Sequence, residues 1–129
     1  MTAADNGTTE ITSPFDFAAT LARVAAAIES AGLTIFARVD HAENARAAGL
    51  AMRPTTLLIY GNAKGGTPIM LVSPRSALDL PLRVLVRQAG AGAVIAFHAI
   101  APALLRAGVP EGLAHRLDTA QRVLTEAIQ

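Results

Sequence analysis

The 129-residue chain has no cysteine and no tryptophan, and its aromatic side chains are one tyrosine and four phenylalanines. Without cysteine it has no disulfides, thiolate metal sites or cysteine nucleophiles. Eleven basic and ten acidic residues leave a net charge of +1, which argues against binding to nucleic acid or to a membrane surface. Lysine occurs only once, at Lys64, whereas arginine is frequent.

Long hydrophobic runs are also missing. The longest apolar stretch, Ala93–Leu105, is interrupted by His98 and Pro102 and is too short to span a bilayer. Met1–Ser13 has no basic segment followed by an apolar run, so we expect no signal peptide and a cytoplasmic location. We expect no metal and no cofactor, because the three histidines lie far apart in the sequence and show no ligand spacing.

What the chain does have is apolar residues, which make up 52% of it and exclude an intrinsically disordered protein. A chain of this length has room for one hydrophobic core. We therefore expect residues 8–129 to form a single domain. Residues 1–7 are expected to be a disordered or weakly ordered tail.

The order of predicted elements indicates the fold class. Ser13 and Pro14 predict the start of a helix whose apolar stripe runs from Phe17 to Ala31, with Gly32 ending it. Alternation and turn residues predict strands at 8–12, 33–39, 55–60, 82–88 and 93–98, short helices at 40–49, 67–72 and 102–107, and a final helix from Glu111. This order predicts an α+β fold in which two long helices cover one face of a largely antiparallel sheet.

The segment Gly61–Thr67 is the main candidate for a binding site. It lies between a predicted strand and a predicted helix, where backbone amides often bind anions. It is neither a Walker A motif nor a dinucleotide fingerprint, because Lys64 precedes the glycine pair and the glycine spacing differs. A tight turn with a solvated lysine and a small-anion site both stay open. The candidate ligand-binding residues are Asn62, Lys64, Gly65, Gly66 and Thr67.

Two further groups of polar residues are candidates. His41 and Asn44 lie on a predicted short helix, and His41 could act as a general acid or base if a partner group lay within hydrogen-bonding distance. A structural or surface histidine is the alternative. Asp79 and Arg83 flank a Leu-Pro-Leu sequence, where they form either an ion pair at a turn or part of a site that faces the glycine segment.

Several short sequence segments, taken together, resemble a known family. They are Asp40–Ala45, Gly49-Leu50, Arg53–Asn62, Gly66–Met70 and Asp79–Arg83. In this order they resemble domain-of-unknown-function family 302, whose members are small bacterial and archaeal proteins, over a stretch from about Ser13 to the C-terminus. The resemblance implies a TBP-like α+β fold and a homodimer, but no established biochemical activity. The matching polar residues are His41, Asn44, Asn62, Lys64, Asp79 and Arg83.

The leading hypothesis is a non-enzymatic, homodimeric binding or regulatory module with a cleft for a small anionic molecule at Gly61–Thr67. In this hypothesis Lys64 and the backbone amides hold the anion, while Asn62 and Arg83 orient it. The first alternative is an enzyme that uses His41 as acid or base near Lys64. The second is a structural module that binds other proteins through an exposed apolar surface.

Overall fold

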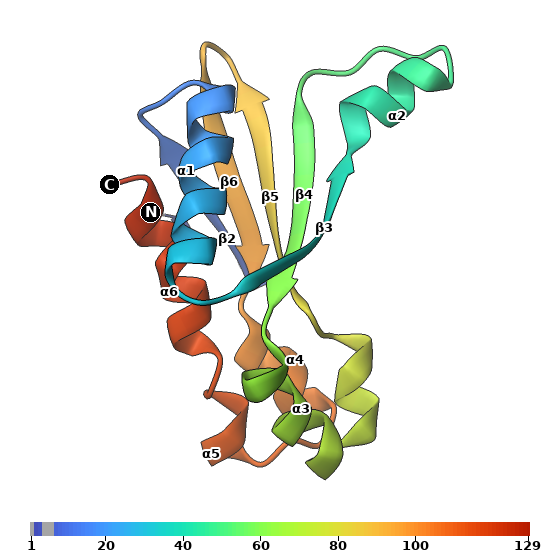
Figure 1. Ribbon diagram of the computed structural model, residues 1–129, viewed down its shortest axis with the longest axis vertical. Helices are drawn as coiled ribbons and strands as arrows, with labels where there is room; N and C mark the ends of the chain where they lie inside the picture. The colour runs from blue at the N-terminus through green and yellow to red at the C-terminus, as the bar shows by residue number, and fades with distance from the viewer. Residues whose placement is uncertain (1, 4–6) are drawn as a thin grey trace.

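A six-stranded antiparallel sheet forms the centre of the protein (Figure 1). The computed structural model describes residues 7–129 together with the backbone of residues 2–3. Across the sheet the strands follow the order β1-β2-β6-β5-β4-β3. Their bounds are β1 Thr2–Ala3, β2 Thr8–Ser13, β3 Thr34–Asp40, β4 Thr55–Gly61, β5 Leu82–Ala89 and β6 Gly92–His98.

Helices lie on one face of the sheet and at one of its ends. The helical segments are α1 Phe17–Ser30, α2 His41–Ala47, α3 Ala63–Val72, the 3-10 segment η1 Pro74–Leu78, α4 Ile100–Arg106, α5 Glu111–Ala114 and α6 Asp118–Ala127. Figure 1 shows α1 and α6 side by side on one face, and α3, α4 and α5 gathered at the lower end. This lower end holds the carboxyl ends of β4 and β6.

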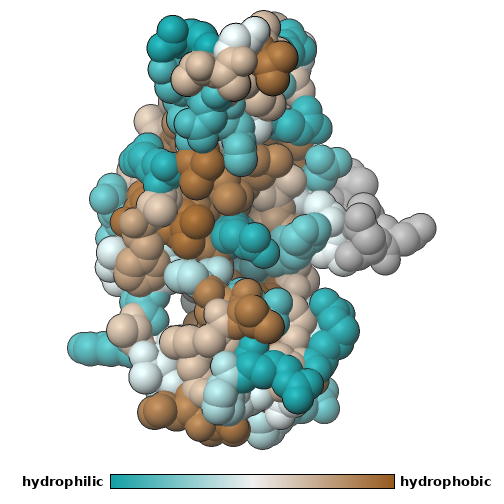
Figure 2. All heavy atoms as spheres, turned by 90° about the vertical axis from the view of Figure 1, so that its right-hand side faces the viewer, coloured by the Kyte–Doolittle hydropathy of each residue, from teal (hydrophilic) through white to brown (hydrophobic). Residues whose placement is uncertain are grey.

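The core lies between the sheet and the pair of helices α1 and α6. Leu58 and Tyr60 of β4 are fully buried, as are Val24 and Ile28 of α1 and Leu124 of α6. Alternate strand residues point to opposite faces of a sheet. The side chains between these buried positions are half-buried and face the other way, among them Leu57, Ile59, Leu85 and Val94. Figure 2 shows a band of hydrophobic side chains at mid-height on this side of the molecule.

The structure confirms the predicted α+β class, the antiparallel sheet and the two long helices on one face. The five predicted strands are present within one or two residues of their expected bounds. Part of the predicted tail 1–7 lies outside the described residues. Within that tail the backbone of Thr2–Ala3 pairs with Glu10 and Thr9 of β2.

The first helix begins three residues later than predicted. Asp16, rather than Ser13, caps α1, and its Oδ1 accepts a hydrogen bond from the backbone N–H of Ala19 at 2.8 Å. Ser13 ends β2 instead, where it is buried and its hydroxyl lies 2.7 Å from that of Thr20. The Ser13 hydroxyl also accepts a hydrogen bond from the backbone N–H of Phe15 at 3.1 Å, so it stabilises the turn between β2 and α1 instead of capping the helix.

Replacing Asp16 with alanine is expected to lower the free energy of unfolding by about 1 kcal/mol, because an N–H of the first turn of α1 loses its acceptor. Urea denaturation followed by circular dichroism measures the change. Glu29→Ala is the matched control, since it removes an exposed carboxylate from the negative end of the same helix. That control is expected to be neutral or slightly stabilising. Equal losses in both variants would contradict the assignment of the cap.

The last predicted helix is interrupted, and in this respect the prediction was wrong. Instead of one helix from Glu111, α5 ends at Ala114 and α6 begins at Asp118. The backbone N–H of Asp118 donates to the carbonyl of His115, and the carboxylate of Asp118 lies 2.9 Å from Nδ1 of His115. Gly112 is a poor helix former inside the short α5, and the turn after it carries Leu117 toward α3.

Candidate functional site

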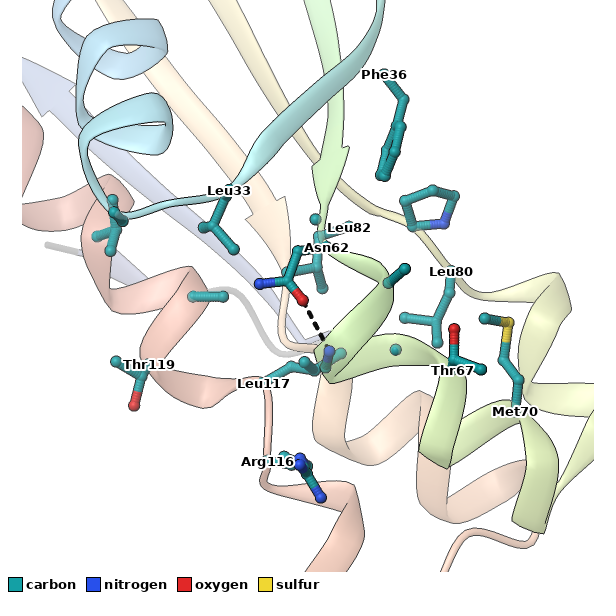
Figure 3. Close-up of a pocket in the computed structure, with 18 residues that line it drawn as sticks. Leu33, Phe36, Asn62, Thr67, Met70, Leu80, Leu82, Arg116, Leu117 and Thr119 are labelled. Carbon is teal, nitrogen blue, oxygen red and sulfur yellow. Dashed lines mark hydrogen bonds between the residues drawn. The ribbon is translucent and has the colours of Figure 1, made fainter.

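A pocket of about 410 Å³ lies where the end of β4 and the start of α3 meet the beginning of β3 and the α5–α6 turn (Figure 3). This volume is within the range of small-molecule sites. Most of its wall is apolar. The apolar lining includes Leu33, Phe36, Met70, Leu80, Leu82, Leu117 and Val123, whereas the polar side chains are Asn62, Thr67, Arg116 and Thr119.

Asn62 fixes the start of α3 at one wall of the pocket. It is the N-cap, and its Oδ1 accepts a hydrogen bond from the backbone N–H of Gly65 at 2.7 Å. The prediction of a glycine loop at Gly61–Thr67 was therefore wrong, because the helix starts at Ala63 and includes both Gly65 and Gly66. Asparagine is among the best N-cap residues, and its capping outweighs the low helix propensity of the two glycines.

Gly65 is explained by packing rather than by a turn. A Cβ at this position would lie 3.2 Å from Cδ2 of Leu117 and 3.6 Å from Oδ1 of Asn62. The missing side chain therefore allows α3 to approach the α5–α6 turn closely. Gly66 differs, since a Cβ there would be 3.9 Å from the side chains of Leu80 and Met70, which is ordinary contact.

The structure brings some of the predicted ligand-binding residues together. Asn62, Gly65, Gly66 and Thr67 all line the pocket. Lys64 is exposed and is not part of the lining. The expected anion-binding pair of Lys64 and Arg83 is therefore not assembled in this pocket.

Arg83 lies on the other face of the sheet. It pairs in register with Ile59, and its neighbours along β5, Leu82 and Val84, are both buried in the core. Because strand side chains alternate, the exposed Arg83 points away from α1 and α6. Asp79 directly follows the segment η1 and is half-buried. It does not line the pocket, although the next residue, Leu80, does.

His41 and Asn44 lie at the opposite end of β4 from the pocket. Asp40, the residue before His41, pairs with Thr56 near the start of β4, whereas Asn62 directly follows its end. The stretch of strand between Thr56 and Asn62 corresponds to about 20 Å. The structure does not bring His41 to Lys64, so the geometry that the enzyme alternative required is not present.

Three further residues that no sequence pattern indicated line the pocket: Arg116, Phe36 and Thr119. Arg116 lies in the unpredicted break between α5 and α6, where a continuous helix was expected. Phe36 occupies an irregularity in the β3–β4 register, between the pairs of Ile35 and Ala37. For the break between α5 and α6, the available signal in the sequence was Gly112, a weak helix former within α5.

Tyr60 connects the sheet to the helix beneath the pocket. Its hydroxyl donates a hydrogen bond to the carbonyl of Ala120 in α6 at 3.1 Å. Burial raises the pKa of Tyr60 well above its ordinary value, because the charged phenolate would be desolvated. The side chain therefore stays neutral, and its hydrogen bond joins α6 to β4 next to Ala120 and Gly61, which line the pocket.

Other kinds of site are not seen in residues 7–129. No group of three or more His, Asp or Glu side chains in this range is arranged to hold a metal ion. No helix in the described part of the chain is long and apolar enough to cross a membrane.

Fold and pocket together define a small α+β domain with an antiparallel sheet and a ligand-sized apolar pocket at one end. The chain belongs to the DUF302 family, since it matches "Domain of unknown function DUF302" over residues 9–129. Its fold is similar to the crystal structure of an uncharacterised conserved DUF302 protein from Bacillus stearothermophilus, with a TM-score of 0.81 and 13% identity over 95% of both chains.

Curated relatives come from Brucella species. The chain is 42% identical over 90 residues to a protein of Brucella suis named fluoride-specific ion channel FluC 1, and that match includes 70% of this chain and 35% of the relative. Similarly named proteins of Brucella abortus and Brucella melitensis match with the same identity over 33% of their lengths. The chain therefore spans about a third of the length of the curated relatives it matches.

Proposed function

We propose that this protein is a non-enzymatic binding module, and that its site for a small ligand with an anionic group is the pocket beside α3. One observation carries the proposal: a pocket of ligand size lies at the segment that the sequence singled out, with Asn62, Gly65, Gly66 and Thr67 in its wall. The positive charge comes from Arg116, in place of the predicted Lys64 and Arg83.

The polar groups of the pocket are suited to a ligand that accepts hydrogen bonds. The amide oxygen of Asn62 is used by the cap of α3, but no residue in the described part of the chain accepts a hydrogen bond from its Nδ2. Arg116 makes no ion pair with any described residue, so its guanidinium is available as well. The site therefore offers a neutral donor and a cationic donor beside an apolar wall.

A thermal-shift screen of small metabolites on three proteins tests this proposal. Wild type is compared with Gly66→Leu, which fills the pocket from an ordinary helical position, and with Gly112→Leu, which makes the same change where a Cβ meets nothing within 4 Å. A ligand at about 100 times its dissociation constant adds roughly 2.7 kcal/mol, which raises the melting temperature by roughly 5–15 °C.

We expect the shift in wild type and in Gly112→Leu but not in Gly66→Leu. Two results would overturn the proposal. The first is that no compound shifts wild type. The second is that Gly66→Leu responds to the same compounds as wild type.

A second candidate role follows from the relatives named as fluoride channels. Because this chain matches only about a third of each, we propose that a domain of this kind is joined to the channel in those proteins, and that this chain has a regulatory role for a fluoride channel. Cells that lack the chain should then become more sensitive to fluoride but not to chloride. Equal growth in fluoride with and without the chain would contradict this role.

The homodimer and the cytoplasmic location are also proposals. The half-buried apolar face of the sheet, with Leu57, Ile59, Leu85 and Val94, supports a contact between two copies (Figure 2). Sedimentation equilibrium should give the mass of a dimer, and Leu85→Glu should give that of a monomer. A monomeric wild type at micromolar concentration would refute the dimer.

A further inference from the structure

We propose that the ligand of this pocket is a monocarboxylate with an apolar chain or ring, held with its carboxylate at Arg116 and its apolar part against the side chains from β3, α3 and β5. This inference rests on the proposed binding function and narrows it to one chemical class. It follows from the number of charges, the nature of the walls and the size of the cavity.

The charge of the lining limits the charge of the ligand. Arg116 is the single charged side chain among the described residues that line the pocket, and Lys64 and Arg83 are outside it. One guanidinium can hold one carboxylate through two parallel hydrogen bonds. A phosphate or a dicarboxylate would bring a second negative charge that no second cation of this lining compensates.

The walls limit the rest of the ligand. Figure 3 shows Phe36, Leu80 and Met70 on one side of Asn62, Leu33 on the other, and Arg116 beyond Leu117. A sugar or a nucleoside carries many hydroxyl or ring-nitrogen groups, each of which loses its water and needs a partner when it is buried. The few polar side chains of this pocket cannot satisfy such a ligand, whereas an apolar chain gains free energy from each group that it buries.

The size of the cavity sets the length of the apolar part. A volume of about 410 Å³ corresponds to roughly 14 water-sized groups, since each occupies about 30 Å³. Octanoate fits within this volume and fills most of it, and acetate is far smaller.

Isothermal titration calorimetry with four probes tests the inference: octanoate, the neutral octanamide of the same shape, acetate, and inorganic phosphate. Wild type should bind octanoate about tenfold more tightly than octanamide, the factor that corresponds to a charge-assisted hydrogen bond of about 1.4 kcal/mol. Acetate should bind at least a hundredfold more weakly than octanoate, because each lost methylene costs about fourfold. Phosphate should show no binding.

Two arginine variants form a matched pair for the same experiment. Arg116→Gln should remove the tenfold preference for octanoate over octanamide. Arg122→Gln changes another exposed arginine, which lies in α6 outside the pocket lining, and should keep the tenfold preference. Since both side chains are exposed, neither variant removes packing from the core.

Failure of this inference can be told apart from failure of the binding function. Equal affinities of wild type for octanoate and octanamide, or a preference that persists in Arg116→Gln, would overturn the carboxylate assignment. The same holds if the metabolite screen finds only phosphates or other multiply charged anions and Gly66→Leu abolishes their binding, in which case the binding function stands. A screen without any ligand, together with no binding of octanoate, would overturn both.

Discussion

Gln121→Ala is expected to lower the free energy of unfolding by about 3 kcal/mol. Gln121 is buried in α6, where its Oε1 accepts a hydrogen bond from the N–H of Ile100 at 3.0 Å and its Nε2 donates to the carbonyl of His98 at 2.8 Å. One side chain thus satisfies both backbone groups at the turn from β6 into α4. Without it the buried N–H of Ile100 and the partly buried carbonyl of His98 both lose their partner, and leaving such a group unpaired costs about 1–3 kcal/mol.

Chemical denaturation with urea measures this loss, and the neighbouring residue provides the control. Arg122→Ala removes a long exposed side chain from the same helix and should change the free energy by less than about 0.5 kcal/mol. A loss of less than 1 kcal/mol in Gln121→Ala would mean that water or a shifted backbone satisfies the two groups. Gln121→Leu separates the contribution of side-chain packing from that of the two hydrogen bonds, because leucine keeps apolar packing but makes neither bond.

A steep loss of stability above pH 10 is the second large effect that we expect. In the unfolded chain Tyr60 loses its proton near pH 10, whereas burial raises the pKa of the folded side chain far above that value. The unfolded state therefore binds fewer protons than the folded state above pH 10. Each further pH unit should cost about 1.4 kcal/mol, and below pH 10 the group should contribute no slope.

Tyr60→Phe provides the comparison, because the other titrating groups are common to both proteins. At pH 8 the variant should be less stable than wild type by about 1 kcal/mol, since the carbonyl of Ala120 loses its donor. By pH 11 the two should be about equally stable. Tyr60 is the only tyrosine, so tyrosinate absorbance reports its titration directly. A wild type whose tyrosine titrates near pH 10 while folded would contradict the prediction.

Local patterns were sufficient for most of the fold. The alternation in β5 and the apolar stripe of α1 are determined by neighbours a few residues away, and both are present as expected. The start of α1 was misplaced because the hydroxyl of Ser13 pairs with that of Thr20. The first turn of α3, residues 63–66, was taken for a loop because Gly65 packs on Leu117. The contact between Gly65 and Leu117 joins residues far apart in sequence, so no local pattern contains it.

The candidate site was predictable only in part for the same reason. Asn62 and Thr67 could be located because they stand beside a strong strand–helix junction. Arg83 could have been excluded, since the alternation of Leu82 and Val84 already places it on the opposite face. Arg116 could not be found, because its position depends on a break in the final helix and on how α6 packs against β4.

The pairing of β2 with β6 has a consequence for how the chain folds as it leaves the ribosome. Thr8 pairs with His98 and Ser13 with Ala93, so β2 is made long before its partner. At about 5–20 residues per second, the delay is roughly 4–18 s. During this time β3, β4 and β5 can pair with one another, whereas the backbone N–H and C=O groups of β2 that pair with β6 have no partner strand. Its sequence, Thr-Thr-Glu-Ile-Thr-Ser, is polar, which protects the nascent chain from aggregation through that strand.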